Sequence, residues 1–212
     1  LSANLSGPRR LTAGAARDYL LGFEAVSGRG EFFKSGGKVV KNVTGYDLSK
    51  LMCGSFGTLA VMDEITLKTL PRPETAVSLL FGYADMAAAT AAIASIFASP
   101  HEPHAAAILP AVLACQSGID LGTSYVVIIR LEGIAVSVDD RASHLLANGF
   151  NAAQQERLEV DLSADLWRSI RDVYWFTSHQ GAIWKLSVAP TAAMPLLACI
   201  GETFDMTAYA DW

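Results

Sequence analysis

The chain has 212 residues, of which 51% are hydrophobic and 17% charged, and its formal net charge is -5. A chain of this length and apolar content can bury one large or two small cores, so we expect a globular protein. The acidic total, without a basic stripe interleaved with aromatic residues, argues against a nucleic-acid partner.

Local composition disfavours two further classes of protein. The most apolar window, residues 86–98, contains Thr and Ser and is shorter than the roughly 20 apolar residues of a membrane span, so we predict no span. Cys53, Cys115 and Cys199 lie far apart without a C-x-x-C pair, which disfavours a disulfide framework and an iron–sulfur cluster held by this chain alone. We expect three buried cysteines, a cytoplasmic location and, for any redox chemistry, a separate electron carrier.

The first predicted structures are a loop and a β-hairpin. Residues 4–14 form the loop, in which Arg9 and Arg10 follow Pro8 and are either phosphate-binding forks or solvated charges. Residues 19–26 and 31–34 are two apolar runs around a connection with two glycines, and this pattern predicts a hairpin.

Residues 36–73 carry the strongest functional pattern of the chain. They predict a short helix at 47–52 and a strand at 59–70, with Gly54-Ser55-Phe56-Gly57-Thr58 between them. Backbone N–H groups of such a turn can point into one concavity, and the two hydroxyl groups can add donors for the same anion. No Walker sequence or G-x-G-x-x-G is present, so a tight helix-to-strand connection that simply needs its glycines is an equal alternative.

Two prolines, Pro71 and Pro73, exclude a helix and a central strand, and we place a domain boundary after residue 73. Beyond it the pattern predicts a strand at 75–83, a helix at 85–98 with Asp85 as N-cap, strands at 105–109 and 124–132, a helix at 137–147 that stops at Asn148-Gly149, and a strand at 153–158. This order is typical of a ferredoxin-like split βαβ unit. A helix at 162–173, a strand at 184–188 and a helix at 190–200 are predicted to follow.

Three other features have a functional and a structural interpretation. Residues 1–73 carry ten Lys and Arg against six Asp and Glu, and the rest six against fifteen, which suits an anion-facing half or merely solvated surfaces. His101-Glu102-Pro103-His104 lacks the helical spacing and the fourth ligand of a zinc site, so we predict no metal. The aromatic residues favour a core over a partner surface by about two to one; they are Trp167, Tyr174, Trp175, Phe176 and Trp184.

Residues 41–73 resemble the FAD-binding signature of the vanillyl-alcohol-oxidase (PCMH-type) flavoproteins. The matching run is Lys41-Asn42-Val43-Thr44-Gly45-Tyr46-Asp47-Leu48, then Leu51, Gly54-Ser55, Gly57-Thr58-Leu59, Glu64 and Leu70-Pro71-Arg72-Pro73. Upstream, Ser2-Ala3-Asn4-Leu5-Ser6-Gly7-Pro8-Arg9-Arg10, with Gly14 and Arg17-Asp18, is similar to an earlier flavin-contacting segment of the family. Within the family, the sequence of this run resembles most the FAD-binding E subunits of bacterial glycolate oxidases. The resemblance is strong over residues 1–75 and thinner beyond, where the order of elements and a few residues near Trp184 match.

The resemblance implies an α+β fold, with the second part of a PCMH-type FAD-binding domain at residues 1–73 and a ferredoxin-like α+β cap or substrate domain, truncated at its C-terminus, at 74–212. It implies FAD as the cofactor, bound by Ala3, Asn4, Gly7, Pro8, Arg9, Gly14, Gly54, Ser55, Gly57, Thr58, Leu59 and Val61. It identifies no catalytic residue. The family's first pyrophosphate loop and C-terminal segment have no counterpart, so we expect a fragment that by itself is inactive and binds FAD weakly or not at all.

The function implied by the resemblance is oxidation of the CH–OH group of glycolate or a related 2-hydroxy acid. The family's subunit works with a second flavoprotein subunit and an iron–sulfur subunit that receives the electrons, so any membrane association would be peripheral, through these partners. A second class of function stays open: a scaffolding or interaction subunit whose flavin cradle is inherited but empty. A preparation that stays colourless after addition of FAD would favour this second class.

Overall fold

The computed structural model describes residues 1–40, 45–178 and 180–211. Contacts between residues divide the chain into two compact units, Leu1–Arg72 and Pro73–Trp212. The sequence places the boundary after residue 73, and the assignment of the units to an FAD-binding domain and a cap domain stays a prediction. Lys41, Asn42, Val43 and Thr44 of the FAD-binding signature lie outside the described residues.

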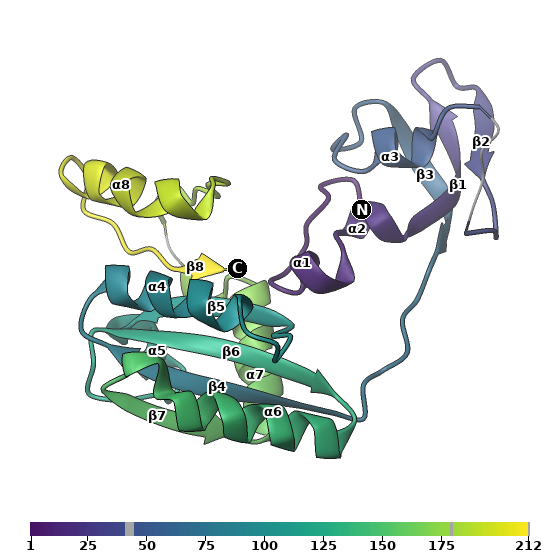
Figure 1. Ribbon diagram of the computed structural model, residues 1–212. Helices are drawn as coiled ribbons and strands as arrows, with labels where there is room; N and C mark the ends of the chain where they lie inside the picture. Colours follow the sequence, from purple (N-terminus) through teal and green to yellow (C-terminus); the bar gives the residue numbers. More distant parts are fainter. Residues whose placement is uncertain (41–44, 179, 212) are drawn as a thin grey trace. The chain divides into compact units, whose positions relative to one another are not determined.

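The first unit is a three-stranded antiparallel sheet with short helices (Figure 1). Its elements are α1 (Arg10–Ala13), α2 (Ala16–Tyr19), β1 (Leu20–Ser27), β2 (Phe32–Gly36), α3 (Leu48–Met52) and β3 (Ala60–Leu67). The strand order is β2-β1-β3, so the predicted hairpin of β1 and β2 is confirmed. Strand β3 ends three residues before its predicted end because Leu67 pairs with Leu20, the first residue of β1; the N–H of Lys68 still donates to the backbone oxygen of Tyr19, which belongs to α2.

One face of this small sheet forms the core of the first unit. Phe23 and Ala25 on β1 are buried with Met52 and Cys53 at the end of α3. Helix α3 therefore ends against the sheet, and its Asp47 cap accepts a hydrogen bond from the N–H of Lys50, as the N-cap position favours. This packing fixes the point at which the glycine-containing turn leaves the helix.

The second unit is a five-stranded antiparallel sheet with the strand order β7-β4-β6-β5-β8 (Figure 1). Its elements are β4 (Thr75–Tyr83), α4 (Met86–Phe97), β5 (Ala105–Pro110), α5 (Ala111–Gln116), β6 (Tyr125–Gly133), α6 (Ala135–Asn148), η1 (Gly149–Asn151), β7 (Gln154–Leu158), α7 (Val160–Arg171), η2 (Tyr174–Phe176), α8 (Pro190–Gly201) and β8 (Ala210–Asp211). Without β8, this order is that of the ferredoxin-like split βαβ unit, so the predicted fold class is confirmed.

Both faces of the second sheet are covered, which explains its continuous apolar strands. On one face Leu79 and Phe81 of β4 pack with residues of α4 and α6. On the other face Leu80 of β4 packs with residues of α5 and α7, including Trp167. The buried polar groups on this face are paired, because the Nε1 of Trp167 donates to the Oγ of Ser78 at 2.7 Å.

Several local predictions for the second unit are confirmed, and one is wrong. Asp85 caps α4 by accepting from the N–H of Ala88, and Gly149 ends α6 in the left-handed region with a φ of 67°. The predicted strand at 184–188 does not form; these residues are exposed and have no strand partner among the described residues. Helix α5 and strand β8 have no counterpart in the prediction.

Two sequence expectations concern the surface. None of the described helices is both long enough and apolar enough to cross a membrane. Cys53 is buried as expected, but Cys115 and Cys199 are exposed on α5 and α8, so the expectation of three buried cysteines is wrong for these two. Both helices present them on faces that no described residue covers, which the local sequence does not reveal.

Candidate cofactor-binding site

The glycine-containing turn between α3 and β3, residues 54–58, is hereafter the cradle turn. Gly54 and Gly57 have φ values of 91° and 78°, and Phe56 between them has a φ of 53°. Glycine adopts this left-handed region without strain, whereas Phe56 is strained there, because its Cβ approaches the backbone. The turn therefore reverses the chain within five residues and carries backbone strain that the surrounding contacts maintain.

The first residues of the chain lie against the cradle turn. The N–H of Phe56 donates to the backbone oxygen of Ser2 at 2.8 Å, and the N–H of Gly54 donates to the oxygen of Leu1 at 3.4 Å. A Cβ added at Gly54 would lie 3.6 Å from the Cβ of Asn4. The fold thus brings together two segments about 50 residues apart, both of which the sequence assigns to the cofactor site.

The cradle turn offers fewer backbone donors than expected from its sequence. The N–H groups of Gly54, Ser55, Phe56 and Thr58 donate to backbone oxygens of the protein itself. The expectation that these amides point together into one concavity is therefore wrong, because they bond to the end of α3, to Ser55 within the turn, and to the first loop, by which we mean residues 1–7. Among the described residues, the N–H of Gly57 is the amide of the turn for which no backbone acceptor is found.

Ser55 supplies a second unsatisfied group at the same place. Its Oγ is buried and has no hydrogen-bond partner among the described residues, while the Oγ1 of Thr58 donates to the backbone oxygen of Ser55 at 2.6 Å. A buried hydroxyl group without a partner costs about 1–3 kcal/mol, so such a group usually has an absent partner such as a ligand or a water molecule. An anionic oxygen would satisfy it, and the site in this respect fits the phosphate groups of FAD.

The space beside Gly57 is compatible with a bound ligand. No atom lies within 4 Å of the position that a Cβ would take at Gly57. Leu59 and Val61, which follow the turn, are 47% and 69% exposed and add apolar surface next to it. The site therefore combines an unsatisfied hydroxyl, an open glycine and an apolar wall, which suits a cofactor with a phosphate part and an apolar part.

The remaining predicted residues surround the first loop. Asn4 is in the left-handed region, and its Oδ1 accepts from the N–H of Arg17 at 3.0 Å, so this oxygen holds the loop. Pro8 is buried, Ala3, Gly7 and Gly14 are half-buried, and Arg9 is exposed at the N-cap of α1. These positions bring Ala3 and Asn4 next to the cradle turn.

Charge and thiol chemistry distinguish this site from a catalytic cysteine site. Burial raises the pKa of the Cys53 thiol, so the residue stays protonated at neutral pH and is a poor nucleophile.

Lys50 on α3 and Asp18 on α2 lie beside the first loop, where the Nζ of Lys50 donates to the backbone oxygen of Arg17 at 2.6 Å. Sequence reasoning missed this role of Lys50, because a contact over 33 residues leaves no local pattern.

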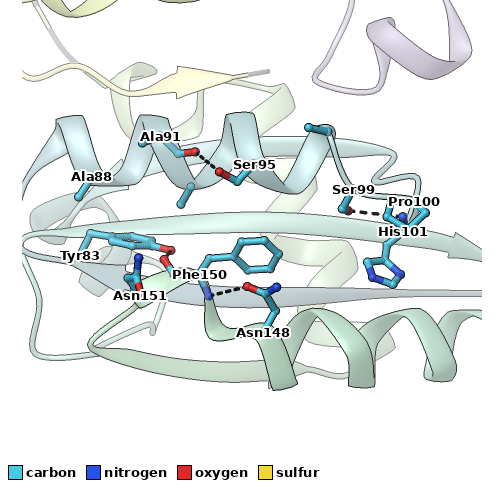
Figure 2. A pocket seen from close by; sticks show the side chains of 12 residues that line it. Tyr83, Ala88, Ala91, Ser95, Ser99, Pro100, His101, Asn148, Phe150 and Asn151 are labelled. Atoms are coloured by element: carbon cyan, nitrogen blue, oxygen red, sulfur yellow. Dashed lines mark hydrogen bonds between the residues drawn. The ribbon is translucent and has the colours of Figure 1, made fainter.

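The second unit has a groove of about 590 Å³ between α4 and the end of α6 (Figure 2). Tyr83, Phe150 and His101 line it, and the hydroxyl group of Tyr83 donates to the backbone oxygen of Phe150 at 3.0 Å. Burial raises the pKa of Tyr83 to about 12, so this hydroxyl is no acid or base near neutral pH.

The other candidate sites of the second unit have structural roles. His101 stacks on His144 with 5.5 Å between the ring centroids, and the Nδ1 of His104 accepts from the N–H of Glu132. The described residues contain no group of three or more His, Cys, Asp or Glu that could hold a metal. The aromatic residues divide between the two interpretations, because Trp167 is buried in the core whereas Trp184 is 82% exposed.

Comparisons with known proteins identify relatives of the chain. The chain is 35% identical over 195 residues to glycolate oxidase subunit GlcE of Escherichia coli (strain K12), covering 92% of this chain and 48% of that protein. It is 40% identical over 113 residues to glycolate oxidase subunit GlcD of Bacillus subtilis (strain 168), covering 53% of this chain and 23% of that protein. The chain thus spans about half the length of the first of these relatives and less of the second.

The fold is shared with a solved enzyme. A structure of alkyldihydroxyacetonephosphate synthase superposes with a TM-score of 0.68 over 96% of this chain and 44% of its own, at 17% sequence identity. No family model matches the chain. The resemblance to the E subunits of glycolate oxidases is confirmed by the similarity to GlcE, which extends over nearly the whole chain. The chain belongs to the family of FAD-linked oxidoreductases that includes the glycolate oxidase subunits.

Proposed function

We propose that the chain is the flavin-binding part of a subunit of a glycolate or related 2-hydroxy acid oxidase. The unsatisfied Oγ of Ser55, buried at the junction of the cradle turn and the first loop, is the observation that carries the proposal. It supports a ligand with anionic oxygens at the place where the sequence resembles a flavin-binding signature. The names of the relatives, glycolate oxidase subunits, support the substrate class.

The cradle turn and the first loop would hold FAD through its phosphate groups. The hydroxyl of Ser55 and the N–H of Gly57 would donate to phosphate oxygens, and Leu59 and Val61 would lie along an apolar part of the cofactor. When bound, the flavin would accept a hydride from the carbon that bears the substrate hydroxyl. The residues of this chain would bind the cofactor and orient it. We assign no proton transfer to any of them.

The electrons must leave the flavin by another carrier. The exposed Cys115 and Cys199 and the buried Cys53 are far apart in sequence, and an iron–sulfur cluster needs several clustered thiolates. We therefore propose a partner iron–sulfur subunit and a second flavoprotein subunit, in a cytoplasmic complex. The free thiols of all three cysteines are compatible with a reducing compartment.

A scaffolding subunit with an empty cradle is the second candidate function. It is favoured by the engagement of four of the five amides of the cradle turn within the protein, which leaves few donors for a cofactor. The two candidates differ in what Ser55 does: it contacts a cofactor in the first and contacts none in the second.

The test is a titration of FAD into the purified chain, followed by flavin fluorescence, in wild type and in Ser55→Ala. Because the Oγ of Ser55 has no partner, its removal should leave the free energy of unfolding unchanged or slightly higher. The affinity for FAD should nevertheless fall about tenfold to a hundredfold, because one charge-assisted hydrogen bond is lost. Ser143→Ala, on the exposed face of α6, is the matched control. Equal FAD affinity in wild type and Ser55→Ala would contradict the proposal.

A further inference from the structure

We propose that Lys50 is a positioning residue of the FAD site, which holds the first loop, residues 1–7, against the cradle turn without touching the cofactor. The inference rests on the proposed function, because the loop and the turn together form the site. It concerns a residue of α3 for which neither the FAD-binding signature nor the relatives give a role.

Lys50 joins two parts of the first unit that are far apart in sequence. It lies on α3, one turn before the cradle turn, and its Nζ donates to the backbone oxygen of Arg17 at 2.6 Å. The same Nζ is 3.9 Å from the Oδ1 of Asp18, and the lysine side chain is 31% exposed. The short bond to the carbonyl is the stronger contact, since the longer and more exposed ion pair is screened by water.

Helix α2, which Lys50 holds, in turn holds the first loop. The N–H of Arg17 donates to the Oδ1 of Asn4 at 3.0 Å, and the N–H of Ala16 donates to the Oγ of Ser6 at 2.9 Å. The carboxylate of Asp18 accepts from the N–H of Ala15 at 2.8 Å and fixes the start of the helix. Both contacts with the loop therefore depend on where α2 lies.

The contacts form a closed ring. It runs from Lys50 through α2 to Asn4, along the first loop to Ser2, across to the N–H of Phe56 and back along the chain to α3. A four-residue helix such as α2 is not stable by itself, so its position depends on such contacts. Of the ring bonds named here, that of Lys50 is the one with a charged donor, and such bonds are about twice as strong as neutral ones.

The direction of the ammonium group separates this role from direct binding. The Nζ of Lys50 donates to the protein backbone and faces a carboxylate, so its charge is partly neutralised before any cofactor arrives. Its removal should therefore displace the first loop, and the affinity for FAD should fall as a consequence.

The experiment compares Lys50→Met with Lys50→Arg, which keeps a charged donor, and with Lys34→Met, an equal change on exposed β2. The first readout, without FAD, is amide hydrogen exchange of the purified chain by NMR. In Lys50→Met we expect exchange about tenfold faster at Arg17 and Phe56, with no change at Ala25 in the core. Lys50→Arg should restore slow exchange, and Lys34→Met should not alter it.

The second readout is the dissociation constant for FAD, which we expect to rise about tenfold in Lys50→Met and to stay unchanged in Lys34→Met. Unchanged exchange at Arg17 and Phe56 in Lys50→Met overturns the inference. Faster exchange with an unchanged FAD affinity also overturns it, because the loop would then move without consequence for the site. If neither the wild type nor any variant binds FAD even at millimolar concentration, where weak binding is still detected, the proposed function fails, while the exchange data still decide whether Lys50 holds the loop.

Discussion

Replacement of Gly57 by valine separates the cost of a strained backbone from the loss of a ligand contact. At a φ of 78° a non-glycine residue is strained by about 1–2 kcal/mol. No atom lies within 4 Å of the added Cβ, so this atom meets no neighbour in the free protein. We therefore expect the free energy of unfolding of Gly57→Val to fall by about 1–2 kcal/mol, with the fold intact.

The effect on FAD should be larger than this strain implies. The valine side chain would occupy the space proposed for the cofactor and shield the N–H of Gly57, which we propose as a donor. Loss of one charge-assisted hydrogen bond costs about 1.5–3 kcal/mol, so the dissociation constant should rise about tenfold to a hundredfold, and more if the side chain also excludes the ligand.

Gly118 provides a matched control in the second unit. Its φ is 76° and the space around its Cβ position is equally open, so Gly118→Val should cause the same loss of stability and no loss of FAD affinity. The assays are urea unfolding and a titration of FAD followed by flavin fluorescence. An FAD affinity that is unchanged in Gly57→Val, or reduced equally in Gly118→Val, would refute the role of the cradle turn.

Two further predictions concern the second unit and its connection. Limited proteolysis with a non-specific protease should cleave first near Glu74 or within residues 116–123, because connectors expose backbone that strands protect; first cleavage inside β3 or β6 would count against the domain boundary. The raised pKa of Tyr83 adds stability that is fully present below the ordinary tyrosine value near pH 10 and is lost as the pH rises toward about 12. Tyr83→Phe should therefore flatten the loss of stability between these pH values, as measured by urea unfolding, and an unchanged slope would exclude Tyr83 as its cause.

The local sequence predicts the helices and strands whose ends are marked by capping residues or by flanking polar or proline-containing segments. Asp85 and Gly149 cap α4 and α6 at the predicted places, and β4 has the predicted bounds because polar or proline-containing segments flank it. The strand predicted at 184–188 does not form, although its residues favour strands. A strand also needs a neighbouring strand to pair with, and the local sequence does not show which distant segment will pair with it. Strand β8, only two residues long, forms because β5 offers an edge to it.

For the site, the sequence predicts the residue types but not their partners. The positive φ values of the glycines at positions 54 and 57 could be expected from the sequence of the turn. The use of the neighbouring amides within the protein could not be predicted, because their acceptors at Leu1 and Ser2 depend on the fold. The unsatisfied hydroxyl of Ser55 is likewise visible only in three dimensions, since it depends on what surrounds the atom.

The central claim, that the cradle turn and the first loop bind FAD, is tested most directly by NMR of the isotope-labelled chain during a titration with FAD. This measurement detects weak binding as well as tight binding and locates it by residue. The account predicts saturable changes in amide shifts centred on residues 54–59 and 3–7, and their loss in the double variant Ser55→Ala/Gly57→Val. Shift changes concentrated in residues 73–212, or none at millimolar FAD, would contradict it.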